Sequence, residues 1–256
     1  MGIIQAAINA VSGDLGDQYG EAIQPPASLS RTFVMAPGVR VRPNDPRNTN
    51  VNNTSNRVSN GSLIHVWPGT MMLLVDGGKI ISACAEPGYF EVSNAAAPSI
   101  WAAADIKGSL MDAFERLKFG GGTPRDQRVY YINMQEIQGI KYGTANPMTY
   151  FDSMYGAELS IRARGTYSFQ IINPIKFFNQ VVSKGAALNN EVVDFNDIKE
   201  QFNGEFLTAL EDSLGKLSMD GVPFNQVKGH SLNLTKYLAD ALDEDWKELR
   251  GMEIKM

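Results

Sequence analysis

The chain begins with a hydrophobic stripe of helical period. Over residues 1–16 apolar side chains recur every three or four positions, while Gln5, Asn9 and Ser12 fall on the other side. The stripe consists of Ile3, Ile4, Ile8, Val11 and Leu15. We therefore predict an amphipathic helix over residues 1–20, whose stripe either packs onto the rest of the chain or contacts a membrane or a partner helix.

Short apolar runs after residue 60 predict strands. Three β-prone runs lie at 63–66, 71–75 and 79–83, and Asp76-Gly77-Gly78 is a hairpin-turn signal between the last two. We expect these runs to form a small antiparallel sheet. The segment 43–60 is polar, dense in Asn and without periodicity, so it predicts an exposed loop.

The middle of the chain alternates between helical and strand patterns. Residues 105–117 have apolar side chains at helical spacing, and three glycines at 120–122 end that pattern. Strand character returns at 127–134 and 157–171. In the second of these runs apolar and polar residues alternate until Gly165, so we expect the sheet to bend strongly there.

Three helices are predicted after residue 173. Asn173 is a good N-cap before Pro174, a longer helix follows Asp194, and a third begins at Ser231. The apolar positions expected to be buried on these helices are Phe177, Phe178, Val181, Val182; Phe195, Ile198, Phe202, Phe206, Leu210, Leu214, Leu217; and Leu234, Leu238, Ala241, Leu242, Trp246, Leu249. Strands followed by helices, with pieces of both interleaved, indicate an α+β fold.

Composition narrows the classes of partner. The chain has 256 residues, of which 43% are hydrophobic, enough for one large domain or two small ones. Its net charge of −5 provides no basic field, so nucleic acid is not expected as a partner. Acidic residues concentrate in 191–256, with 14 acidic against 7 basic residues, and we interpret them as solvated helix surface or as a docking face.

Compartment follows from cysteine usage and from the N-terminus. The single cysteine, Cys84, leaves no internal disulfide and, with two histidines, no structural zinc site of Cys and His ligands. No Lys or Arg precedes Arg31, so a secretory signal is not indicated, and the apolar runs are too short to span a bilayer. We expect a cytoplasmic location.

The sequence presents no recognisable catalytic set. His65 and His230 lie in no catalytic motif, and the glycines at 120–122 are not followed by the Lys-Ser/Thr of a phosphate-binding loop. We therefore predict no catalytic residues, no cofactor and no metal. The alternative is a hydrolytic or small-ligand-binding domain whose pocket would use His65, Asp126, Arg128 and Tyr130.

With these segments in order, the chain resembles SPFH proteins (stomatin, prohibitin, flotillin, HflK-HflC), in particular the bacterial YdjI type that is also labelled virion core-like. The resemblance runs from MGIIQAAINAV through ISACAEPGYF at 81–90 and GGTPRDQRVYYIN to WKELRGMEI at 246–254. Its most specific piece is RGTYSFQIINP at 164–174. It implies an SPFH, band 7-like domain over 21–256, with a mostly antiparallel, strongly bent sheet and packed helices.

The resemblance also implies a function. SPFH proteins of this type are expected to be non-enzymatic, membrane-associated scaffolds that assemble with themselves at the inner face of the cell membrane. Their partners would be a membrane surface or membrane protein, and in envelope stress a phage-shock-type coat protein. A phage or virus structural protein is the alternative that the second label implies.

Family members usually continue beyond the point where this sequence stops. They carry further helix and often a Cys-rich zinc ribbon, neither of which is present here. The last residues, 252–256, also have the pattern of a strand that is just beginning. We therefore expect the sequence to be part of a longer protein.

Overall fold

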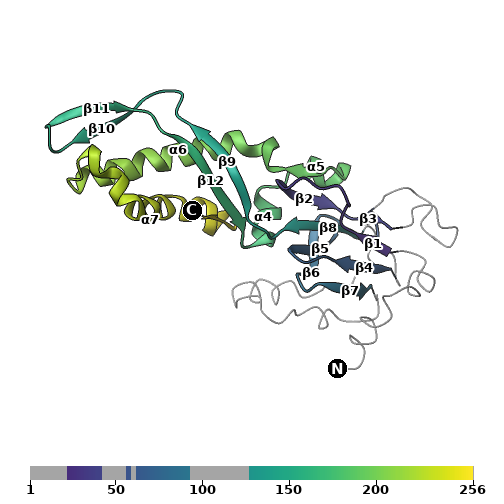
Figure 1. Ribbon diagram of the computed structural model, residues 1–256. Helices are drawn as coiled ribbons and strands as arrows, with labels where there is room; N and C mark the ends of the chain where they lie inside the picture. Colours follow the sequence, from purple (N-terminus) through teal and green to yellow (C-terminus); the bar gives the residue numbers. More distant parts are fainter. Residues whose placement is uncertain (1–21, 42–55, 59–61, 93–126, 256) are drawn as a thin grey trace. The chain divides into compact units, whose positions relative to one another are not determined.

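The computed structural model describes residues 22–41, 56–58, 62–92 and 127–255 (Figure 1). The chain divides into two compact units. Unit 1 comprises residues up to Met134 together with Val182–Val193, and unit 2 comprises Gln135–Val181 and the chain from Asp194 onward. The helices predicted at 1–20 and 105–117 lie outside the described residues.

The described residues of unit 1 form two sheets and one short helix, α5 (Lys184–Asn189). The four-stranded sheet has the order β3 (Val39–Arg40), β1 (Ala22–Gln24), β4 (Leu63–Val66), β7 (Gly88–Glu91). The five-stranded sheet has the order β13 (Val193–Asp194), β2 (Phe33–Pro37), β8 (Gln127–Asn133), β5 (Thr70–Asp76), β6 (Lys79–Cys84). Both sheets contribute to one core, which includes Ile23, Ile64, Val66, Met72, Leu74, Cys84, Val129 and Tyr131.

The predicted strands of unit 1 form, but they divide between the two sheets. The β5–β6 hairpin turns where expected, because Gly77 and Gly78 have φ of 56° and 86°, the left-handed values that a two-residue hairpin turn needs. The prediction of one small antiparallel sheet was wrong, because β4 lies in a different sheet from β5 and β6. It pairs with β1 in parallel and with β7 antiparallel. The turn in which Thr70 N donates to Trp67 O (3.1 Å) separates β4 from β5.

The polar segment 43–60 is described only at 56–58. There Asn56 and Val58 are buried, which differs from the exposed loop that the composition predicted. Val58 N donates to Gln127 O and Val129 N donates to Asn56 O, each at 2.9 Å. Residues 56–58 therefore lie along β8. Their backbone hydrogen bonds to β8 hold this part of a polar segment in a buried position.

Unit 2 combines two ladders with a helical layer. One sheet has the order β14 (Met252–Lys255), β12 (Arg164–Ile171), β9 (Ile137–Gly143), and a separate hairpin pairs β10 (Met148–Asp152) with β11 (Ala157–Ile161). The helices are α4 (Pro174–Gln180), α6 (Phe195–Met219), α7 (Ser231–Leu242), the 3₁₀-helix η2 (Phe224–His230) and the π-helix η3 (Asp243–Leu249). Figure 1 shows α6 crossing behind β9 and β12 and reaching the β10–β11 hairpin.

The predicted helix starts are confirmed. Asn173 Oδ1 accepts a bond from Lys176 N (3.1 Å), and Asp194 forms a capping box with Asp197. The stripes are buried at most predicted positions, including Trp246, whereas Leu249 is 57% exposed. The wider turn of η3 explains this exception, because bonding of the i→i+5 type puts more residues in each turn and moves Leu249 off a stripe drawn with the α-helical period.

The α+β class and the mostly antiparallel pairing are confirmed, since every pairing of described register is antiparallel except β1 with β4. A single strongly bent sheet is not confirmed, because the described strands form four separate sheets. The expected break at Gly165 occurs earlier, at 162–163, between β11 and β12. Gly165 itself lies within β12, where an added Cβ would stand 3.0 Å from Tyr142 Oη.

An aromatic layer joins α6 and η3 to the sheet of unit 2. The Tyr167 ring stacks on Phe206 with centroids 4.3 Å apart, and Trp246 meets Phe202 edge-on at 5.4 Å. The Glu205 carboxylate accepts bonds from Trp246 Nε1 (2.8 Å) and from the Arg250 guanidinium. Burial acts to raise the pKa of Glu205, but the bonds from Arg250 and Trp246 outweigh it and lower that pKa, so the carboxylate stays charged and bonded.

Gly251 provides a test of this packing. Its φ is +70°, its carbonyl accepts bonds from Ile172 N and Asn173 N (2.9 Å each), and an added Cβ would lie 2.5 Å from Asn173 O. We predict that Gly251→Ala lowers the free energy of unfolding by about 1–3 kcal/mol. Gly204→Ala, in open space on α6, is the control and should raise it by about 0.5–1 kcal/mol. Urea unfolding followed by circular dichroism measures both, and equal midpoints would contradict the prediction.

Candidate interaction surface

The sequence-predicted contact stripe lies outside the described residues. It comprises Ile3, Ile4, Ile8, Val11 and Leu15, and its role stays a prediction. Among the residues that the structure does describe, no helix is long and apolar enough to cross a bilayer.

The described residues of the alternative pocket do not converge. Arg128 Nη1 donates to Leu188 O (3.0 Å) and Tyr130 Oη donates to Ala187 O (2.7 Å), so these two β8 side chains bond the backbone around α5. His65 lies on β4, in the other sheet, and Asp126 is outside the described residues. In the described ranges, no group of three or more His, Cys, Asp or Glu side chains is placed to hold a metal ion.

His65 belongs to a ring cluster on the β4–β7 ladder. Its imidazole stacks on Tyr89, the residue opposite on β7, with centroids 4.0 Å apart and planes 7° from parallel. Trp67 Nε1–H donates to His65 Nδ1 (3.0 Å), which places the proton of the neutral ring on Nε2. Burial lowers the pKa of His65. The ring therefore acts as a hydrogen-bond acceptor within the strand, as expected of a structural histidine.

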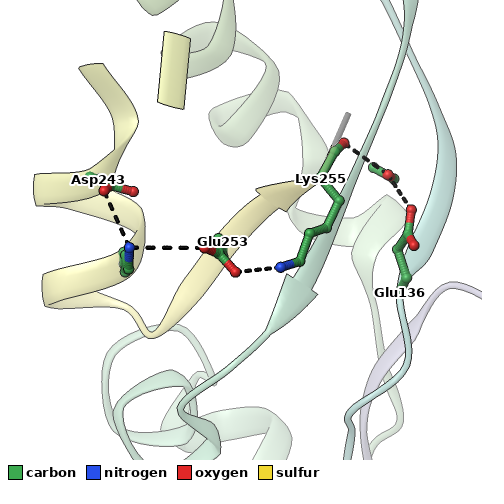
Figure 2. Close-up of polar contacts among 6 residues, drawn as sticks. Glu136, Asp243, Glu253 and Lys255 are labelled. Atoms are coloured by element: carbon green, nitrogen blue, oxygen red, sulfur yellow. Dashed lines mark hydrogen bonds and ion pairs between the residues drawn. The ribbon is translucent and has the colours of Figure 1, made fainter. Parts of the chain in front are cut away.

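A polar ladder crosses the solvent side of unit 2 (Figure 2). Ser168 Oγ contacts the Glu136 carboxylate and lies 2.9 Å from Lys255 O, and Lys255 Nζ pairs with Glu253. Lys247 Nζ continues the series at 3.9 Å from Glu253 and 3.4 Å from Asp243. Half-exposed pairs of this kind contribute about 0–1 kcal/mol each, so the ladder ties η3, β14 and β12 together without forming a chemical site.

The most distinctive surface in the described chain is apolar. Eleven large apolar side chains there are exposed, and five of them belong to two segments that hydrogen bonds join, the β10–β11 turn with the end of β10, and the connection from α6 to η2. We call these five the tip surface: Phe151, Met154, Tyr155, Met219 and Phe224. Exposed apolar residues that occur singly are normal, whereas a gathered group marks an interaction site.

The two segments of the tip surface are bonded to each other. Ser218 Oγ donates to Phe151 O (2.7 Å) and Ser153 Oγ donates to Gly221 O (2.8 Å). Tyr150, which points inward from β10, donates from Oη to Val222 O (2.6 Å). The hairpin turn and the α6–η2 connection therefore behave as one frame that carries the apolar side chains.

Asp152 is the centre of that frame. Its carboxylate is buried, Oδ2 accepts from Phe224 N (2.9 Å), and Oδ1 accepts from Met154 N (2.8 Å) and Tyr155 N (3.2 Å). The bond from Phe224 is the main reason that the pKa of Asp152 is lowered, with those from Tyr155 and Met154 adding to it. The turn closes through Gly156 N, which donates to Asp152 O (2.8 Å) at φ +62°.

Sequence reasoning missed the tip surface. One available signal was the turn chemistry of Asp152, Ser153 and Gly156, which encloses Met154 and Tyr155. The other was the alternation before it, in which Met148 and Tyr150 are buried and the positions between and after them are exposed.

The Asp152 frame predicts a pH dependence. A carboxyl group with a lower pKa in the folded state stabilises the fold above its unfolded pKa, and this stabilisation is lost as pH falls through the folded pKa. We predict that Asp152→Asn lowers the melting temperature at pH 7 and flattens its fall below about pH 4. Asp240→Asn, an exposed carboxylate on α7, is the control. Calorimetric melting at several pH values measures this, and parallel profiles for wild type and Asp152→Asn would count against the frame.

Comparison with known proteins gives one positive finding. The SPFH domain-Band 7 family model matches residues 50–256, which includes all of unit 2 and much of unit 1. No curated protein matches the chain. Proteins with this domain are generally non-enzymatic scaffolds that typically form homo-oligomers and associate with membranes. Because the match covers most of its length, the chain belongs to the SPFH domain-Band 7 family.

Proposed function

We propose that this protein is a non-enzymatic, membrane-associated scaffold that assembles with itself and recruits partners. The observation that carries the proposal is the tip surface, five exposed apolar side chains held on a hydrogen-bonded frame in a chain of the SPFH family. The described residues of the alternative pocket also support it, because Arg128, Tyr130 and His65 make hydrogen bonds that hold the fold.

The finer parts of the proposal come from the sequence. The N-terminal stripe of Ile3, Ile4, Ile8, Val11 and Leu15 contacts the inner face of the cell membrane or a membrane protein. The exposed carboxylates of α7 and η3, which include Asp240, Glu244, Asp245 and Glu248, face other subunits or a basic partner. The resemblance to the YdjI type supports a role in envelope stress beside a phage-shock-type coat protein.

Liposome flotation tests the membrane contact. We predict that changing Ile4, Ile8 and Val11 together to Asp reduces the bound fraction roughly tenfold or more, because each buried aliphatic side chain contributes about 1.5–3 kcal/mol. The control changes Gln5, Asn9 and Ser12 to Asp, which adds the same charge to the polar side of the helix. Equal flotation of the two triple variants would remove the stripe from the membrane role.

Sedimentation velocity tests the self-assembly. We predict that the chain sediments as species larger than its 28.1 kDa monomer and that their size grows with concentration. Added salt should reduce assembly if the acidic helices take part, because exposed charges are screened within about 8–10 Å at physiological salt. A single monomeric species over a hundredfold range of concentration contradicts the scaffold.

A further inference from the structure

We propose that the tip surface inserts into the interfacial region of a net-neutral, zwitterionic bilayer. The inference rests on the proposed membrane association and deepens it, because it names a contact surface in unit 2 that is separate from the N-terminal stripe. The exposure, the hydrogen bonding and the charge of the residues that form the tip surface favour lipid as its occupant.

The exposed side chains are of the kind that enters a lipid interface. Met154, Tyr155 and Met219 are 65%, 72% and 88% exposed, so most of their apolar area is in water in the isolated chain. Moving this area out of water is favourable, and a tyrosine can keep its hydroxyl at the headgroup level while its ring lies deeper. The turn closes one end of the β10–β11 ladder (Figure 1), and such an apex enters a fluid layer without needing a matching groove.

Several backbone groups at the turn are paired within the protein. A polar backbone group can enter lipid only when it is paired within the protein. Here Met154 N and Tyr155 N bond the Asp152 carboxylate, Gly156 N bonds Asp152 O, and Phe151 O accepts from Ser218 Oγ. The Asp152 carboxylate accepts three backbone N–H bonds and is 1% exposed, so the turn carries its charge inside rather than at its surface.

Charge selects the kind of bilayer. The segments 142–161 and 217–227 contain no Lys or Arg, and their carboxylates are Asp152, Glu158 and Asp220. Asp152 is buried, whereas Glu158 and Asp220 are exposed, and Asp220 also accepts a bond from Tyr237 Oη (2.6 Å), so the charge that these segments turn outward is negative. A surface without basic groups gains nothing from anionic lipids, which attract polybasic segments. It matches zwitterionic headgroups, and its binding should be insensitive to salt.

Flotation of the full chain with phosphatidylcholine vesicles tests the inference. We expect the Met154→Asp, Tyr155→Asp double variant to bind at least about tenfold more weakly than wild type, at both low and high salt. The matched control is Leu188→Asp with Leu249→Asp, which adds two carboxylates at exposed apolar positions outside the tip surface and should change binding less than about twofold. Met219→Asp, on α6, is a second and independent tip variant, and unchanged unfolding midpoints establish that all variants fold.

The outcomes separate this inference from the proposed function. If both tip variants float like wild type while the N-terminal stripe variant does not, the inference falls and the membrane-associated scaffold stands. The inference is also overturned if binding to vesicles requires phosphatidylserine, or if binding is lost at high salt. Tip variants that float normally but no longer assemble would show that the surface contacts protein instead. If wild type fails to float on any vesicle, both proposals fall.

Discussion

Unit 2 depends on the packing of α6 against the sheet of β14, β12 and β9. The helix is fixed along this sheet by the stacking of Tyr167 on Phe206 and by Glu205, whose carboxylate bonds both Trp246 and Arg250. Because α6 has 25 residues, it extends past the sheet, and its last turn holds β10 through the bond from Ser218 to Phe151. The tip surface is therefore positioned by the same helix that organises the core.

Two charged carboxylates hold structure in this unit, one buried and one partly exposed. Glu205 and Asp152 are both carboxylates with lowered pKa values, and in both cases the bonds that lower the pKa include one between segments far apart in the sequence, from Arg250 to Glu205 and from Phe224 to Asp152. A carboxylate that is fully satisfied by neighbouring donors is stabilised in its charged form and is poorly suited to carry protons at neutral pH. This accords with a family whose members are generally scaffolds.

Local signals in the sequence predicted the parts of the fold that local interactions decide. The Asn173-Pro174 helix start, the start of the next helix after Asp194 and the Asp76-Gly77-Gly78 turn follow from hydrogen bonds within a few residues. The division of strands among four sheets does not, because β4 finds its partners in β1 and β7 rather than in the adjacent β5. The tip surface was not predictable for the same reason: its turn is fixed by a bond between Asp152 and Phe224, which are 72 positions apart.

The contact proposed for the tip surface is one between a preformed apolar turn and lipid. The most direct measurement places an environment-sensitive fluorescent probe at position 155, through Tyr155→Cys. A Cys84→Ala background removes the one native thiol, so that the probe reacts at position 155 alone. A blue shift and a rise in emission on adding phosphatidylcholine vesicles are predicted, with no change for the same probe at the exposed position Asn233 on α7. An identical response at the two positions, or none at 155 while the protein is bound, would contradict the account.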